Sequence, residues 1–141
     1  DGEPQGTAGI PVMDTLKKAG VVDVAVVATR YFGGILLGGG GLIRAYSHTA
    51  TIALAAAQKV AMRECLLLEL PCDYGFYGKA AGLIPECGGV VDDTRFLEQV
   101  TLRFHLEPQL LPALEKKLAD SSSGRASVKQ AGQRFFPFPV D

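Results

Sequence analysis

The sequence has no excess of basic residues, since 14 Lys and Arg side chains are balanced by 15 Asp and Glu side chains and the formal net charge is −1. Binding of nucleic acid by bulk electrostatic attraction is thereby excluded. Charge is nearly balanced within each part of the chain as well, with five basic and four acidic residues over 1–61 and nine basic and eleven acidic residues over 62–141. This distribution excludes a bulk basic surface but is compatible with a local anion-binding site.

Cysteine is scarce, and the sequence has no long uninterrupted apolar run. The three cysteines, Cys65, Cys72 and Cys87, are odd in number, and their spacing fits neither a disulfide framework nor a CxxC metal site. The most apolar stretch, 42–62, is broken by charged and polar side chains and is unsuited to span a bilayer. No signal-peptide pattern occurs. The sequence therefore predicts a reduced, cytoplasmic protein with no membrane contact, metal or cofactor.

A recognisable catalytic set is also missing. Asp1, Glu3 and Asp14 have no histidine at metal-ligand spacing, and such carboxylates usually cap helices or carry surface charge. Ser47 and Cys65 have no evident base near them in the sequence and no nucleophile motif around them. The sequence therefore favours a protein that is not an enzyme.

What is present is the composition of a folded protein, with 48% hydrophobic and 21% charged residues, which excludes a disordered chain. The clearest pattern lies over 62–141, where strand and helix periodicities alternate. We expect a strand over 63–72, a helix over 73–86 with Asp73 as its N-cap, a strand at 90–91, a hairpin connection at 92–95, a strand over 96–106 with His105 exposed, a helix from 108 and a last strand over 126–136. The order βαββαβ predicts a ferredoxin-like domain in an α+β protein of two domains.

Residues 1–61 are predicted to form part of a βα domain. A helix is expected from Pro11 to Gly20, a strand buried on both faces over 21–30, a glycine-rich loop over 33–41 and a long helix over 42–61. A single strand needs a neighbour for its backbone donors and acceptors. We therefore expect a segment preceding Asp1, or another chain, to supply that neighbour, and Asp1 to be an interior position of the native protein.

The strongest functional signal is the glycine-rich loop before the long helix. Amide groups that no side chain shields can converge on an anion at a helix N-terminus, where the helix dipole favours negative charge. A second interpretation is that the small residues let the loop pack tightly against a sheet. The candidate anion-binding glycines are Gly33, Gly34, Gly38, Gly39, Gly40 and Gly41.

Charged and aromatic side chains flank these glycines. Arg30, Arg44 and His48 would add positive charge, and Tyr31 and Tyr46 would offer stacking surfaces for bases. Alternatively, each tyrosine is a core aromatic whose hydroxyl is hydrogen-bonded, and Arg44 and His48 belong to a solvated helix face. The sequence leaves these alternatives open.

Two motif blocks resemble the YigZ/IMPACT family. One block runs from Thr29 to Gly38 and continues over 42–46, and the other contains Asp1, Gly2, Glu3, Pro4, Gly6, Thr7, Gly9 and Pro11. The resemblance implies an N-terminal domain with the fold of a small-subunit ribosomal protein and of a late domain of elongation factor G, its leading strands and helix absent here. It also implies that residues 62–141 are the ferredoxin-like C-terminal domain of bacterial members, which are suspected of binding nucleic acid or the translation machinery.

Three functional hypotheses follow from the residues and the resemblance. The leading one is a non-enzymatic RNA-binding or ribosome-associated protein that regulates translation. The second is a protein-interaction regulator that meets a translation factor through the stripe of Arg44, His48 and Thr51 or through the segment 1–11. The third is an enzyme acting on a small phosphate-bearing ligand.

Overall fold

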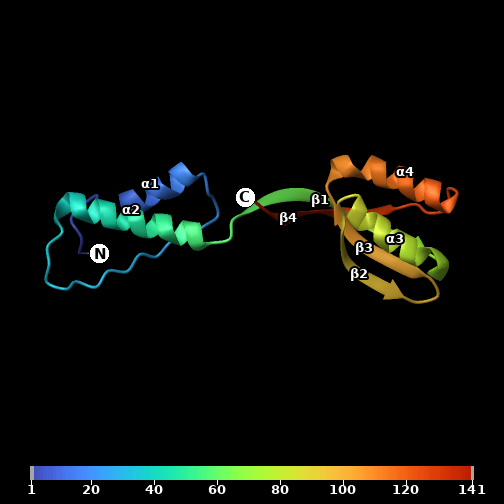
Figure 1. Cartoon of the computed structure of the whole chain (residues 1–141), viewed down its shortest axis with the longest axis horizontal. Helices are drawn as coiled ribbons and strands as arrows, with labels where there is room; N and C mark the ends of the chain where they lie inside the picture. The colour runs from blue at the N-terminus through green and yellow to red at the C-terminus, as the bar shows by residue number, and fades with distance from the viewer. Residues whose placement is uncertain (1, 141) are drawn as a thin grey trace. The chain divides into compact units, whose positions relative to one another are not determined.

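The computed structural model describes residues 2–140 and divides into two compact units, Asp1–Lys59 and Val60–Asp141 (Figure 1). The first unit contains two helices, and the second contains two helices, a short 3₁₀ turn and a four-stranded sheet. This arrangement confirms the α+β class. Within residues 2–140, no helix is long and apolar enough to cross a membrane.

Helix α1 (Gly9–Ala19) opens the first unit and confirms the predicted helix. It begins two residues earlier than expected, so that Pro11 lies in its first turn, where a missing amide proton costs no helix hydrogen bond. Gly20 ends the helix in the left-handed conformation, with φ of 69°, and its amide donates to the carbonyl of Lys17. The buried face of the helix consists of Pro11 and Leu16.

The strand predicted over 21–30 is not formed. This segment is non-helical, and no residue within 2–140 pairs with it in a ladder. Its valines are not covered on both faces, since Val22 is 80% exposed and Val27 is 90% exposed. The prediction was wrong because β-branched composition favours a strand only where a neighbouring strand accepts its hydrogen bonds.

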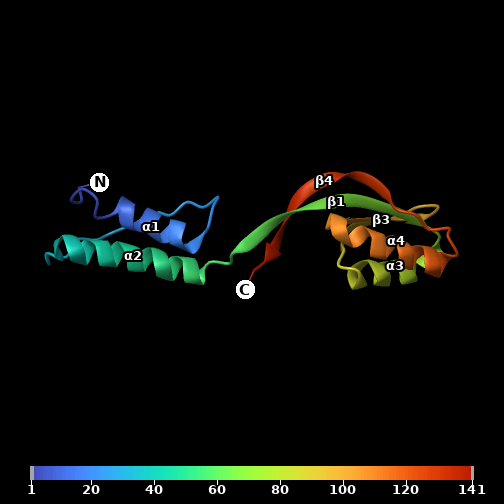
Figure 2. The ribbon, with the colours of Figure 1, turned by 90° about the horizontal axis from the view of Figure 1, so that it is seen from above.

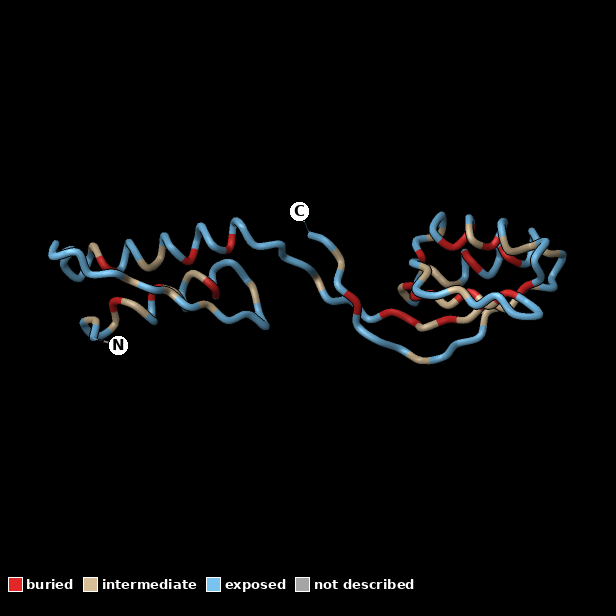
Figure 3. The backbone as a smooth tube through the Cα atoms, turned by 90° about the horizontal axis from the view of Figure 1, so that it is seen from below, coloured by how far each residue is buried: buried red, intermediate tan, exposed pale blue. Residues whose placement is uncertain are grey.

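Helix α2 (Gly38–Ala56) starts four residues before the predicted position and ends five residues sooner. The glycine-rich stretch is therefore only partly a loop, because Gly38 to Gly41 form the first turn of the helix. Gly38 has φ of 74°, a conformation that glycine adopts without strain. Most of the helix surface is exposed (Figure 3), and its buried residues are Leu42, Ala50 and Leu54.

The second unit confirms the predicted βαββαβ order. Its elements are β1 (Val60–Cys72), α3 (Tyr74–Glu86), β2 (Val90–Phe96), β3 (Val100–Leu106), a 3₁₀ turn (Pro108–Leu110), α4 (Leu111–Ser122) and β4 (Lys129–Pro139). Neighbouring strands are antiparallel in the order β2-β3-β1-β4, which is the ferredoxin-like topology. Both helices lie on one face of the sheet (Figure 2).

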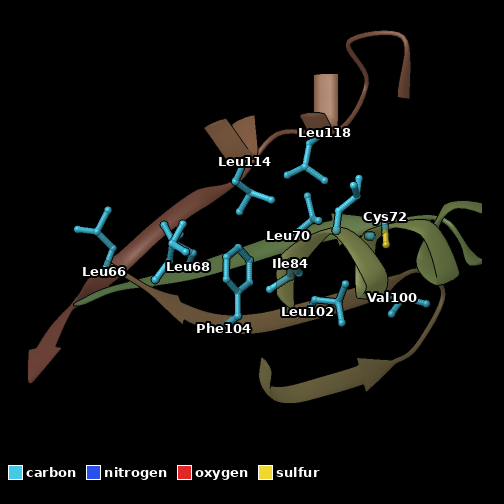
Figure 4. Close-up of a cluster of buried hydrophobic side chains, with 13 residues drawn as sticks. Leu66, Leu68, Leu70, Cys72, Ile84, Val100, Leu102, Phe104, Leu114 and Leu118 are labelled. Carbon is cyan, nitrogen blue, oxygen red and sulfur yellow. The ribbon is translucent and has the colours of Figure 1, made fainter. Parts of the chain in front are cut away.

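Alternation along the strands explains the core between that face and the helices. Successive residues of a strand point to opposite faces, so β1 and β3 each contribute every second side chain (Figure 4). The core members from the strands and helices include Leu66, Leu68, Leu70, Leu102, Phe104, Ile84, Leu114 and Leu118. Asp73 caps α3 as predicted, its Oδ1 accepting a 2.7 Å hydrogen bond from the Phe76 amide.

Two details of the sequence-based description of this unit were wrong. The segment 92–95 is not a hairpin connection but part of β2, and the chain reverses instead at 97–99, where the Leu97 amide donates to the carbonyl of Gln99. His105 is not exposed: it is 8% accessible, with its ring stacked on Phe136 and its Nδ1 at 2.9 Å from the Asp92 carboxylate. Neither partner is near His105 in the sequence, so alternation alone could not predict its burial.

Candidate anion-binding site

Three segments of the first unit meet at Glu3. Nη1 of Arg30 donates to both carboxylate oxygens of Glu3, at 2.7 and 2.8 Å, and the Tyr46 hydroxyl donates to Oε1 at 3.0 Å. The Arg30 guanidinium also lies over the Phe32 ring, 5.2 Å from its centroid. Both members of the ion pair are mostly shielded, with side-chain exposures of 25% for Arg30 and 17% for Glu3. The cluster connects the two motif blocks across 27 and 43 residues of sequence.

The titration behaviour of the cluster follows from these contacts. The hydrogen bond from Arg30 lowers the pKa of Glu3 below its ordinary value. Burial raises the pKa of Tyr46, and the hydrogen bond to Glu3 raises it further. Arg30 is thus ion-paired with a carboxylate, so a phosphate would compete with Glu3 for it, and its anion-binding role stays a prediction. The alternative that Tyr46 is a packed aromatic with a hydrogen-bonded hydroxyl is the one observed.

This ion pair predicts a pH dependence of stability in the first unit. The pKa of Glu3 is lower in the folded state than the ordinary 4.5. The contribution of the ionised Glu3 carboxylate to folding stability is therefore complete above pH 4.5 and is lost as the pH falls through the lowered pKa. Thermal unfolding of the wild type and of Glu3→Gln should be compared between pH about 3 and about 6. The stability difference between the two proteins should shrink on acidification, and a constant difference would contradict the prediction.

The remaining residues of the first motif block occupy structural positions, and Asp1 lies outside the described residues. Thr7 is buried and its hydroxyl donates to the carbonyl of Pro4, which closes the turn that leads into α1. Gly2, Glu3 and Pro4 line a cleft, Gly6 lines a groove between α1 and α2, and Gly9 and Pro11 lie in the first turn of α1.

The amino-terminal turn of α2 is open. Methyl groups placed on Gly33, Gly34, Gly38 or Gly39 would meet no heavy atom within 4 Å, and only at Gly41 would one lie close, 3.1 Å from Cβ of Leu37. The interpretation that all these glycines serve tight packing is therefore wrong for most of them. No side chain caps the helix, and within residues 2–140 the amides of Gly38 to Gly40 have no hydrogen-bond acceptor.

These amides border a cleft of about 560 Å³. Its lining includes Gly38 and Gly39, the ion-paired Glu3 and Arg30, and Phe32. Arg44 approaches the same turn, because a methyl group on Gly40 would lie 3.4 Å from its Nη1. Within the described part of the chain no carboxylate lies within 4.0 Å of Arg44. The turn therefore combines unpaired amide donors with an unpaired guanidinium, which suits an anion.

The other predicted site residues are placed less favourably. Tyr31 is 92% exposed and is free to stack on a base, so the core interpretation is wrong for it. His48 is exposed, as its helix-face interpretation implies, but it lies seven residues beyond Gly41, about 10 Å along the helix axis. Arg44 thus lies beside the glycine amides, and Arg30 lines the same cleft in its ion pair with Glu3, whereas Tyr31 and Tyr46 line a neighbouring pocket with Gly33.

Sequence reasoning missed the role of Glu3, which was interpreted as a cap or a surface charge. The signal that could have found it is the presence of acidic residues in one motif block and of Arg30 and Tyr46 in the other block. A metal role for its neighbourhood finds no support, as no cluster of three or more His, Cys, Asp or Glu suited to a metal ion occurs within residues 2–140.

Comparison with known proteins agrees with the two-unit architecture. The model of the Impact N-terminal domain matches residues 1–54, and the domain of unknown function DUF1949 matches residues 70–125. An IMPACT family member from Thermus thermophilus is 33% identical over 131 residues, which cover 92% of this chain and 72% of the relative. The chain belongs to the IMPACT family. This confirms the resemblance inferred from the two motif blocks.

Other IMPACT family relatives are similar over most of the chain. YvyE of Bacillus subtilis (strain 168) is 33% identical over 130 residues, 92% of this chain and 60% of YvyE, and YigZ of Escherichia coli (strain K12) is 38% identical over 126 residues, 88% of this chain and 61% of YigZ. The chain therefore spans about three fifths of the length of these two relatives. A solved structure described as a hypothetical protein matches with a TM-score of 0.55 and 35% identity, over 91% of this chain and 62% of that one.

Proposed function

We propose that this IMPACT family chain is a non-enzymatic, cytoplasmic RNA-binding or ribosome-associated protein that contacts phosphate at the amino-terminal turn of α2 and thereby regulates translation. One observation carries the proposal: within residues 2–140, the amides of Gly38 to Gly40 have no acceptor, and the guanidinium of Arg44 beside them has no carboxylate within 4.0 Å. A phosphate oxygen accepts hydrogen bonds from both kinds of donor. Tyr31 lies on the adjoining loop and exposes a ring on which an unpaired base can stack.

The electrostatics of the first unit make this a site for few phosphates. Arg30 is already ion-paired with Glu3, so that Arg44 is the cation that remains next to the amides. The logarithm of RNA affinity should therefore fall only shallowly with the logarithm of salt concentration, because each neutralised phosphate of a single strand contributes about 0.7 to that slope.

Replacing Arg44 by glutamine tests the proposal. We expect a weaker affinity for transfer RNA and ribosomal RNA fragments, and a salt slope reduced by about 1, since one phosphate contact is lost. Fluorescence anisotropy at several salt concentrations measures both quantities. Arg125→Gln is the matched control, because it removes an exposed positive charge from the other unit. Equal affinities for the two variants, or no binding of RNA by the wild type at low salt, would refute the proposal.

A second function is favoured by the groove between α1 and α2. This groove of about 760 Å³ is lined by Ile10, Ile43 and Thr51 among others, and Ile10 is 61% exposed. We propose as the alternative that a translation-factor protein binds here, since apolar side chains rimmed by polar ones are typical of protein interfaces. Capture of a translation factor that survives nuclease treatment and is lost in Ile10→Asp would favour this alternative over RNA.

A further inference from the structure

The second unit carries a separate set of cation–aromatic contacts, on the face of its sheet that the helices leave uncovered. Both α3 and α4 lie against the opposite face (Figure 2). On the uncovered face, alternation along β4 brings Arg134, Phe136 and Phe138 to the surface side by side. The antiparallel register places Arg63 of β1 opposite Phe136, so that its side chain shares this face.

Phe136 is the middle layer of a three-layer stack. The His105 ring lies parallel to it, with centroids 3.6 Å apart and an interplanar angle of 7°. The Arg134 guanidinium lies 4.3 Å from the same centroid. Because His105 covers one side of the ring, the guanidinium packs on the other side, and Phe136 retains only 7% exposure. The outer layer of the stack is therefore the exposed guanidinium of Arg134.

A second stack lies beside the first. The Arg63 guanidinium lies 5.0 Å from the centroid of Phe138, and the Arg63 side chain is 49% exposed. Phe138 follows Phe136 by two residues on the same strand, a spacing of about 7 Å. The β1–β4 part of the face thus presents two guanidinium groups, each supported by an aromatic ring.

Two cations of this face lie in those stacks, and the register that pairs Lys129 with Glu69 brings the exposed Lys129 to the same face. The cations nearer β2 and β3 are neutralised by carboxylates, in the pairs Arg95–Asp93 at 3.7 Å and Arg103–Glu69 at 3.0 Å. Arg134 has no carboxylate within 4.0 Å in the part of the chain that the structure describes, whereas Arg63 is paired with Glu107 at 3.5 Å and its side chain is 49% exposed. The planar charge that no carboxylate compensates is therefore that of Arg134, and the half-exposed guanidinium of Arg63 lies beside it.

We propose that this face binds a single-stranded stretch of RNA, whose bases stack on the guanidinium groups of Arg63 and Arg134. Unpaired bases stack on aromatic rings and on arginine planes, and the same cations attract the flanking phosphates. An apolar protein segment would instead have to remove both cations from water. This proposal shares with the proposed function only the choice of RNA as the ligand. Its residues belong to the second unit, whereas the α2 site belongs to the first.

The substitution Arg134→Lys separates stacking from charge, because lysine keeps the positive charge but has no planar group. The full chain should be titrated with a fluorescent oligouridylate and with an abasic oligomer of the same length. We expect the variant to bind the oligouridylate about fivefold or more weakly, whereas binding of the abasic oligomer, which has phosphates but no bases, stays within about twofold. Arg63→Lys should act in the same direction, which covers the case in which one variant alters the sheet.

Arg125→Lys is the control for a change of arginine that lies outside the face, and circular dichroism checks that each variant is folded. Unchanged affinity for the oligouridylate in both folded lysine variants would overturn the inference. So would a competition experiment in which polyglutamate displaces the labelled oligouridylate as effectively as unlabelled oligouridylate does. Loss of affinity in Arg134→Lys with none in Arg44→Gln would retain this inference and refute the α2 site. The reverse result would retain the α2 site and refute this inference.

Discussion

Replacing Phe104 by alanine is expected to lower the free energy of unfolding of the second unit by about 3–5 kcal/mol. Phe104 is 1% exposed on β3 and belongs to the cluster between the sheet and the two helices. Truncation removes the apolar area that the ring buries and leaves a cavity whose walls, the strands and helices, cannot close. Chemical denaturation followed by circular dichroism measures the loss.

Phe135→Ala is the matched control for this substitution. It removes the same side chain from β4, where the ring is 57% exposed and covers little of the core. A change within about 0.5 kcal/mol is expected there. If both variants lost the same stability, the assignment of Phe104 to the core would be wrong.

Replacing Gly39 by aspartate is expected to stabilise the first unit and at the same time to abolish most RNA binding at α2. A side chain fits, since a methyl group at this position would meet no heavy atom within 4 Å. A carboxylate in the first turn contributes about 0.3–1 kcal/mol through the helix dipole, and replacing the glycine adds less than the about 0.5–1 kcal/mol that alanine would give, because aspartate is a weak helix former. The same carboxylate repels phosphate from the amides, so RNA affinity should fall about tenfold or more.

Gly39→Ala distinguishes the two effects. It should raise the stability by the glycine contribution alone and keep RNA affinity close to that of the wild type, because no charge is added. Thermal unfolding and fluorescence anisotropy on the same preparations give both quantities. A Gly39→Asp protein that binds RNA as well as Gly39→Ala does would show that the turn is not a phosphate site.

Local sequence patterns were sufficient for most of the second unit. Alternation over 100–106 and helical spacing over 74–86 are set by which side chains the core covers, and Asp73 caps its helix through an atom three residues away. Such signals act within a few residues, where the periods of helix and strand are read directly. The hairpin was misplaced because Asp92 and Asp93 favour turns locally, while pairing of β2 with β3 kept them in a strand.

Only the tertiary structure showed which charged and polar side chains are partners. Sequence analysis by itself determined the ferredoxin-like order, the helix α1 and the motif blocks of the family, since each depends on neighbouring residues or on the blocks themselves. It could not show that Glu3 neutralises Arg30 and binds Tyr46, because these groups are 27 and 43 residues apart and meet only after folding. The burial of His105 against Phe136 likewise depends on strand register. Whether a charge is paired depends on such distant partners, so only the structure shows that Arg30 is paired with Glu3, whereas Arg44 and Arg134 have no carboxylate within 4.0 Å in the described part of the chain.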